Sequence, residues 1–262
     1  MNLRVFCIGD IVGNPGRRVI NKKLSQLKTD LQIDFCIANA ENAAGGSGLT
    51  PDLARELLSK GIDVLTMGDH VWRKREIISA IDRGLPILRP ENLPRGVPGK
   101  GAMVLNMDNG FEVAVISILG RVFMKPNDCP FAAVDRVLDR LSSRTPVIVV
   151  EFHAEATSEK IAMGYHLDSR VSAVVGTHTH VTTADETILA GGTAYLTDLG
   201  MTGPINSVLG RKVEKVLYNF TTGLPAPFDI ATGPAMLNGV LIEIDRETGR
   251  ASKIERIRVE DC

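Results

Sequence analysis

Residues 174–180 read Val-Val-Gly-Thr-His-Thr-His, an apolar run of strand length that ends in two histidines. Four further apolar runs end in charged or amide side chains, namely Val5-Phe-Cys-Ile-Gly-Asp10, Phe35-Cys-Ile-Ala-Asn-Ala-Glu41-Asn42, Val64-Leu-Thr-Met-Gly-Asp69-His70 and Val147-Ile-Val-Val-Glu-Phe-His153. Longer segments of helical periodicity separate these runs. Short apolar strands that alternate with helices are typical of an α/β fold, so the sequence predicts sheets layered with helices.

The same periodicities define the expected elements by residue range. We expect strands at 3–8, 34–38, 63–67, 103–106, 112–118, 146–150, 173–176, 192–196 and 238–244. We expect helices at 16–27, 50–59, 74–81, 131–141, 157–167 and 210–220. No low-complexity linker and no solenoid repeat divides the chain. The sequence therefore predicts a single domain over residues 1–262 with two sheets, the second half being more antiparallel.

The charge balance of the 262-residue chain excludes several classes of partner. Lys and Arg number 30 against 31 Asp and Glu, which gives a formal net charge of -1. Without a basic excess we expect neither a stable nucleic-acid partner nor attraction to an anionic membrane. No window approaches the ~18 to 20 continuous apolar residues that a membrane span needs.

The cysteines carry no metal or disulfide signature. Cys7, Cys36, Cys129 and Cys262 are scattered without a CxxC pair, which argues against a zinc ribbon, a redox pair or a dense disulfide framework. The first ten residues hold too short an apolar run for a signal peptide. We therefore expect a cytoplasmic protein with reduced thiols.

The polar residues at the strand ends are the candidate functional site. Ligands of open α/β sheets bind beyond the carboxyl ends of the strands, so these side chains should converge. They are Asp10, Glu41, Asn42, Asp69, His70, His153, His178 and His180. Each one alone reads as a turn, cap or structural residue. Together they would be costly to bury without compensation, and a metal supplies that compensation.

The types of ligand narrow the chemistry of this site. Oxygen and imidazole donors without thiolate suit Mn, Fe, Zn or related first-row ions. The candidates are too many for one ion. Two ions about 3.5 to 4 Å apart, bridged by a carboxylate and a water, would use all of them and form the clamp of two-metal phosphoesterases. The sequence therefore predicts phosphoester hydrolysis.

Several longer strings resemble those of a known family. The strings are Gly9-Asp10-Ile-Val-Gly, Ala40-Glu41-Asn42-Ala-Ala-Gly-Gly, Gly68-Asp69-His70-Val-Trp72, Phe152-His153-Ala-Glu-Ala-Thr-Ser-Glu-Lys160, Gly176-Thr-His178-Thr-His180-Val and Thr197-Asp198-Leu-Gly-Met-Thr-Gly-Pro204. They resemble the YmdB-type cyclic-nucleotide phosphodiesterases of the calcineurin-like metallophosphoesterase superfamily. The resemblance runs from Asp10 past Pro204. It implies a four-layer αββα sandwich with a dinuclear site at the strand ends.

The resemblance also implies a role for each candidate. Asp10 and His180, with Asn42 assisting, look like ligands of one ion. The ligands of the other look like Asp69, His153 and His178, with Glu41 bridging the two ions. The ions would be divalent or mixed-valence, with Fe or Mn preferred over Zn.

The implied reaction is the hydrolysis of a small phosphodiester such as 2′,3′- or 3′,5′-cAMP. A metal-bridging hydroxide would be the nucleophile. His70 would be the general acid that protonates the departing ribose oxygen, a role suited to an imidazole because it titrates near neutral pH. The resemblance further implies self-association into a homo-oligomer.

Two positions depart from the superfamily pattern. Val12 holds the place of the His in the usual Asp-x-His motif, and Glu41-Asn42 compensates for it in the YmdB-like branch. Asp69 stands where Asn is common, so three carboxylates against two divalent ions leave about one net positive charge instead of two. We expect weaker attraction of phosphate or an altered metal preference, with monoanionic diesters favoured over dianionic monoesters.

Two alternative functions remain open at this point. The same site could serve a phosphomonoesterase or a nuclease, although the near-neutral charge speaks against long nucleic acid. Alternatively, the chain could be a catalytically weak nucleotide-binding regulatory module, which the unusual Asp69 allows.

Overall fold

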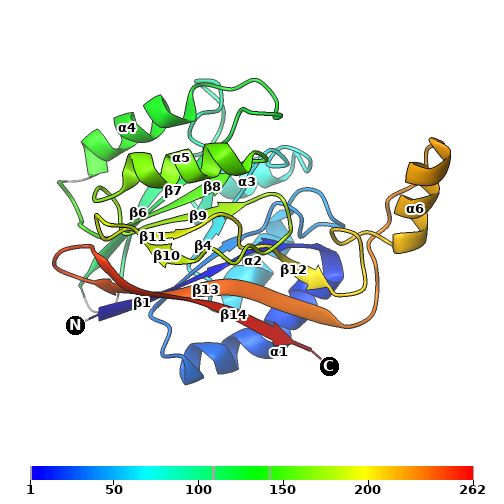
Figure 1. Cartoon of the computed structure of the whole chain (residues 1–262), viewed down its shortest axis with the longest axis horizontal. Helices are drawn as coiled ribbons and strands as arrows, with labels where there is room; N and C mark the ends of the chain where they lie inside the picture. Colours follow the sequence, from blue (N-terminus) through cyan, green and yellow to red (C-terminus); the bar gives the residue numbers. More distant parts are fainter. Residues whose placement is uncertain (1, 108–109, 142, 262) are drawn as a thin grey trace.

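The computed structural model describes residues 2–107, 110–141 and 143–261, so Cys262 lies outside the described part. Its centre is a pair of stacked β-sheets (Figure 1). The first sheet has the order β2-β12-β13-β1-β3-β4-β5, with β14 paired to β13. Its strands are β1 (Asn2–Ile8), β2 (Asp10–Ile11), β3 (Phe35–Asn39), β4 (Val64–Thr66), β5 (Ile87–Leu88), β12 (Met201–Pro204), β13 (Ala235–Asp245) and β14 (Ala251–Glu260).

The second sheet has the order β10-β11-β9-β8-β7-β6. Its strands are β6 (Ala102–Asn106), β7 (Glu112–Leu119), β8 (Ile148–His153), β9 (Ala173–Thr177), β10 (Thr187–Ile188) and β11 (Ala194–Leu196). Strands β1, β3, β4 and β5 run parallel in the first sheet, as do β7, β8, β9 and β11 in the second. Their carboxyl ends therefore share an edge within each sheet.

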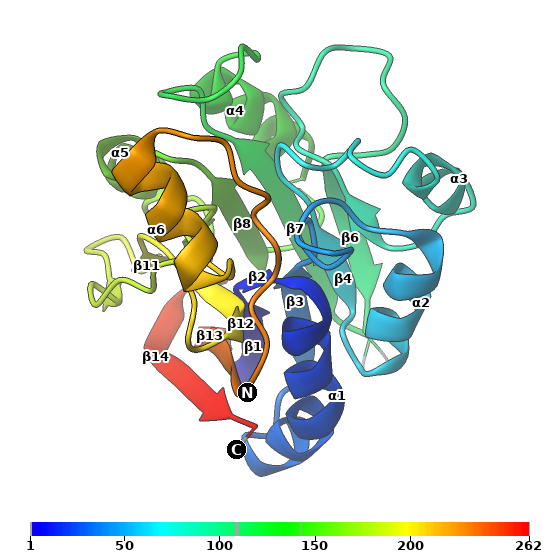
Figure 2. The ribbon, with the colours of Figure 1, turned by 90° about the vertical axis from the view of Figure 1, so that its right-hand side faces the viewer.

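Helices cover the outer face of each sheet (Figures 1 and 2). Helices α1 (Gly13–Asp30), α2 (Pro51–Ser59) and α3 (Ile77–Asp82) pack on the first sheet, and α4 (Pro130–Leu141) and α5 (Thr157–Leu167) pack on the second. Helix α6 (Val213–Thr222) stands apart from these layers. The start of α2 follows its sequence, because the Thr50 hydroxyl accepts a hydrogen bond from the Leu53 amide.

The period of two residues along each strand explains the layers. In β1, Val5 and Cys7 belong to the core between the sheets, whereas Phe6 and Ile8 belong to the core under the first-sheet helices. Strands buried on both faces read as continuous apolar runs, which is how they were recognisable in the sequence. The predicted four-layer αββα sandwich is confirmed.

The expected elements all overlap observed ones, most of them with shifted ends, and the helix expected at 157–167 has the bounds of α5. The largest omission from the expected elements is β14 (Ala251–Glu260), whose side chains are mostly exposed or half-buried and include many charges. Its strand conformation depends on antiparallel pairing with the buried β13, which is a tertiary contact. Within the described residues the cysteines are free, and no helix is long and apolar enough to cross a membrane.

Candidate metal centre

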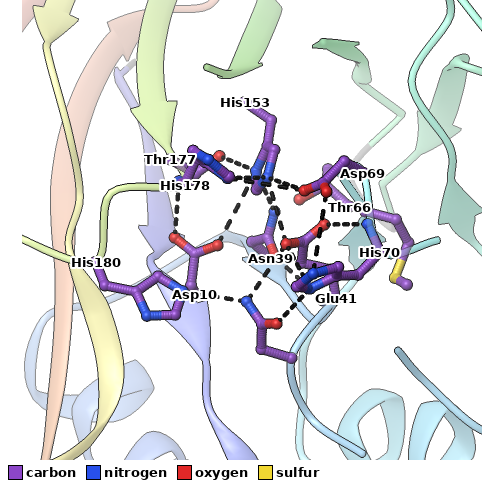
Figure 3. A network of polar contacts seen from close by, with 12 residues as sticks. Asp10, Asn39, Glu41, Thr66, Asp69, His70, His153, Thr177, His178 and His180 are labelled. Atoms are coloured by element: carbon purple, nitrogen blue, oxygen red, sulfur yellow. Dashed lines mark hydrogen bonds and ion pairs between the residues drawn. The ribbon is translucent and has the colours of Figure 1, made fainter. Parts of the chain in front are cut away.

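Side chains that follow separate strands meet at one edge of the sheets (Figure 3). Asp10 lies in β2, Glu41 and Asn42 follow β3, Asp69 and His70 follow β4, His153 ends β8, and His178 and His180 follow β9. The structure thus brings both sheets' contributions to one place. The expected strand at 146–150 is observed at Ile148–His153, so His153 is part of the strand itself.

The tightest part of this site consists of Glu41, Asp69, His153 and His178. Each offers one ligand atom, and these atoms lie within 4.8 Å of one another. Nε2 of His153 lies 3.3 Å from Glu41 Oε1, 3.5 Å from Asp69 Oδ1 and 3.0 Å from His178 Nδ1. Among the described residues this is the one such group of His, Cys and acidic side chains. It could hold a metal ion.

A buried hydrogen-bond chain orients the His153 ring. Thr177 Oγ1 donates to Glu151 Oε1 at 2.7 Å, so it accepts from the Nδ1–H of His153 at 2.9 Å. Asn39 Nδ2 also donates to Glu151 Oε1 at 2.6 Å, and Asn39 Oδ1 accepts from the Glu41 amide. The Nε2 atom is thereby left facing the carboxylates, as outer partners of metal-bound imidazoles commonly arrange.

The charges of the site call for a cation at its centre. Burial raises the pKa of the Asp10 carboxyl well above its usual range. Burial alone would lower the pKa of His153, but the carboxylates of Glu41 and Asp69 raise it well above its usual value. Burial opposes ionisation of Glu41 too, yet His153 brings its pKa down to about 2. The buried carboxylates around His153 therefore favour positive charge at this place, which a bound metal ion would supply.

The donor set fits a first-row metal ion. Asp10 Oδ1 and Asp69 Oδ1 are buried and accept no hydrogen bond from the described residues. Burial and the neighbouring His153 lower the pKa of His178 to about 4, so its imidazole is neutral near pH 7. Unused carboxylate lone pairs beside a neutral imidazole, without thiolate, suit Mn, Fe or Zn.

A second set of polar groups lies beside this centre. His180 Nδ1 donates to the Leu209 carbonyl at 3.2 Å, which leaves its Nε2 to accept from Asn42 Nδ2 at 3.1 Å. Asn42 Oδ1 lies 2.8 Å from Nδ1 of His70. Asp10 Oδ2 accepts from the His178 amide. Asp10 and His180 thus border the four-residue group without belonging to it.

The loop after β9 is held by a buried ion pair. His178 and His180 have φ of 98° and 66°, in the left-handed region that non-glycine residues rarely adopt. Between them, Thr179 donates from its amide and its hydroxyl to Asp198 Oδ2. Lys160 Nζ donates to the same oxygen at 2.6 Å. These contacts hold both histidines in place.

Sequence reasoning assigned no role to Glu151, Asn39 or Asp198. A signal for Glu151 was present, because it lies two residues before His153 in the same strand, so both side chains share one face of β8. A Cβ at Gly68 would overlap the His153 ring, so that glycine allows the loop to approach. The sequence could not reveal that Asn39 of the first sheet donates a hydrogen bond to Glu151 of the second.

A cavity of about 380 Å³ opens from the site. Its polar wall includes Glu41, Asn42, His70, His178 and His180. A small substrate placed in this cavity would therefore reach His70 and the candidate metal ligands together.

The family model described as YmdB-like protein matches residues 6–257. The chain belongs to the YmdB-like family. It is 49% identical to the 2′,3′-cyclic-nucleotide 2′-phosphodiesterase of Bacillus subtilis (strain 168), over 99% of this chain and 98% of that protein. This match confirms the expected family and the expected class of phosphoester hydrolase.

Two solved structures resemble the whole chain. A hypothetical protein from Thermus thermophilus is 41% identical with a TM-score of 0.92, covering 98% of this chain and 99% of that one. A phosphatase from Mycoplasma pneumoniae is 34% identical with a TM-score of 0.93, covering 99% and 94%. Both share the fold along almost its full length.

Proposed function

We propose that this chain hydrolyses 2′,3′-cyclic nucleotides by adding water to phosphorus and breaking the bond to O2′, which leaves a nucleoside 3′-phosphate. The main support is the group of Glu41, Asp69, His153 and His178, because two of its members, Glu41 and His178, line a cavity that His70 also lines. The name of the Bacillus subtilis relative supports the cyclic substrate. A 3′,5′-cyclic nucleotide is the second substrate to be tested.

The site is proposed to bind two metal ions, Fe or Mn before Zn. Asp69, His153 and His178 would hold one, and Asp10, His180 and Asn42 the other, with Glu41 between them. When bound, the ions supply an activated water and neutralise charge on the phosphate. Thr177 and Asn39 act behind these residues by fixing the His153 ring and the Glu41 backbone.

His70 is proposed to protonate the departing O2′. Its Nδ1 lies 2.8 Å from Asn42 Oδ1 and 3.3 Å from Glu41 Oε1, and its amide donates to Glu41 Oε2. The ring is thus held from its Nδ1 side. Its side chain lines the cavity and stays partly exposed, so Nε2 can carry a proton to a substrate oxygen.

Asp69 is proposed to favour diesters. It adds a negative charge where Asn would add none, and a dianionic monoester meets more repulsion from it than a monoanionic diester does. The ratio of diester to monoester turnover therefore distinguishes a phosphodiesterase from a phosphomonoesterase that uses the same site.

The test compares 2′,3′-cAMP, 3′,5′-cAMP, AMP and a short RNA as substrates of the metal-loaded protein. The variant is His70→Ala, with His166→Ala as the control. His166 pairs with Asp135 at 2.9 Å, away from the cavity lining. We expect turnover of 2′,3′-cAMP that falls about 10²- to 10⁴-fold in His70→Ala and persists in His166→Ala. Nucleotide binding without hydrolysis by the parent protein would instead indicate a regulatory module.

Four broader expectations remain proposals. Residues 1–262 are proposed to act as one domain, because no low-complexity linker divides the sequence. A cytoplasmic location is proposed because the described cysteines are free and the sequence has no CxxC spacing. Self-association into a homo-oligomer and the absence of a stable nucleic-acid partner are proposed with them. Light scattering and an RNA-binding titration test the last two.

A further inference from the structure

The cavity beside the metal centre has a second wall that the reaction does not use. This wall is apolar and comes from residues 208–228, which include α6. Its members are Val208, Leu209, Val216, Phe220 and Phe228. Figure 2 shows α6 standing beside the edge where the strands end. Arg211 is the one cationic side chain among the described residues that line the cavity.

The apolar wall belongs to residues 208–231, which we call the arm. The two ends of this segment are hydrogen-bonded to each other. The Lys212 amide donates to the Asp229 carbonyl at 3.0 Å, and the Ala231 amide donates to the Gly210 carbonyl at 2.9 Å. Backbone hydrogen bonds therefore join the two ends of residues 208–231 as they join the strands of a short hairpin. In the sequence, helix α6 and Phe228 lie between these two ends.

The arm is also tied directly to the candidate site. Arg211 donates to the Phe228 carbonyl at 2.9 Å and to the Gly46 carbonyl at 2.7 Å, which links the arm to the loop that follows Glu41. The Leu209 carbonyl accepts from His180. The apolar wall is thereby held at a set position relative to the histidines.

The aromatic side chains of this wall are only partly covered by the rest of the described chain. Phe220 is 76% exposed and Phe228 is 43% exposed, although both line the cavity. A nucleobase carries a flat apolar face, and stacking on aromatic side chains is a common way to bind it without selecting one base. The volume of about 380 Å³ is within the range of sites for small organic ligands.

We infer that the apolar wall of residues 208–228 is the nucleobase subsite, in which Phe228 and Phe220 contact the base. Arg211 is a positioning residue that holds the wall against the loop after Glu41. This inference rests on the proposed cyclic-nucleotide activity and adds where the base lies. A single nucleotide is then the preferred substrate, and base identity matters little.

The test compares adenosine 2′,3′-cyclic phosphate with methyl ribofuranoside 2′,3′-cyclic phosphate, which lacks the base. Phe228→Ala and Phe220→Ala are the variants. Tyr218→Ala is the control, since it is an exposed aromatic on the same helix that does not line the cavity. We expect KM for the nucleotide to rise about tenfold in a Phe variant, with kcat and the baseless substrate's KM unchanged. The Tyr218→Ala control should leave kcat and both KM values unchanged.

A binding measurement gives a second readout that does not depend on turnover. Calorimetry with adenosine 3′-phosphate and with ribose 3-phosphate should show a loss of affinity in the Phe variants for the nucleotide alone. Equal losses for both ligands, or none, would overturn the inference.

Competing locations and functions give different results. A separate hollow of about 270 Å³ is lined by Asp69 and Trp72, so a Trp72→Ala variant that alone raises the nucleotide KM would place the base there and overturn the inference. A Phe220→Ala variant that changes only the oligomeric state would make this wall an interface between copies. If the parent protein hydrolyses neither cyclic substrate, it is the proposed function that fails.

Discussion

Replacing Lys160 with Met tests how much the buried ion pair behind the loop of His178 and His180 contributes to the free energy of unfolding. Lys160 and Asp198 are each 1% exposed, and Nζ lies 2.6 Å from Oδ2. Met keeps the length and apolar character of the Lys stem but removes the ammonium group. Asp198 then remains buried as an uncompensated carboxylate.

The expected cost follows from the contacts that remain. Removing one partner of a buried ion pair costs about 3–5 kcal/mol. Asp198 keeps hydrogen bonds from the Thr179 amide, the Thr179 hydroxyl and the Gly200 amide, so the loss should lie near the lower end, about 3 kcal/mol. At about 2.1 cal/mol/K of unfolding entropy per residue, a loss of this size lowers Tm by roughly 5 °C in a chain of 262 residues.

Circular dichroism during heating measures Tm, with Lys253→Met as the matched control. Lys253 pairs with Glu255 at the same 2.6 Å, but both side chains are at least half exposed. An exposed pair contributes little, so this control should leave Tm nearly unchanged. Equal shifts in the two variants would refute the reasoning, because burial is what distinguishes the pairs.

Further predictions concern the site and the carboxyl end of the chain. Asp69→Asn should raise the ratio of monoester to diester turnover. An unchanged ratio, metal content and pH profile would contradict the charge argument. Thr177→Val removes the acceptor of His153 Nδ1–H and should weaken metal affinity about 10- to 100-fold, as measured by competition with a chelator. The Asp261 carboxylate accepts from the Arg18 guanidinium at 2.6 Å, which lowers the pKa of Asp261. This stabilisation is present above the usual carboxyl pKa and is lost as the pH falls through the lowered value. Urea unfolding should therefore show Asp261→Asn to be destabilised at pH 7 and much less so near pH 2, whereas an equal deficit at both would argue against the ion pair.

The sequence by itself determined the central buried strands and the order of polar groups along the chain. Two-sided burial makes β1, β3, β8 and β9 read as continuous apolar runs, and the residues that follow them are local in the sequence. The carboxyl ends of parallel strands lie at the same edge of a sheet. Groups as distant in the sequence as Asp10 and His180 could therefore be expected to meet. The helices on the outer faces followed from their periodicity.

Only the tertiary structure decided which groups orient the site. Thr177 and Glu151 fix the proton on His153 across two neighbouring strands, and Lys160 reaches Asp198 from α5. Such contacts depend on side-chain directions between distant segments, about which local propensity is silent. The same holds for the arm, whose helix has the periodicity of an ordinary surface helix. Its apolar residues form a wall because hydrogen bonds at residues 209–212 and 229–231 place that wall against the candidate metal centre.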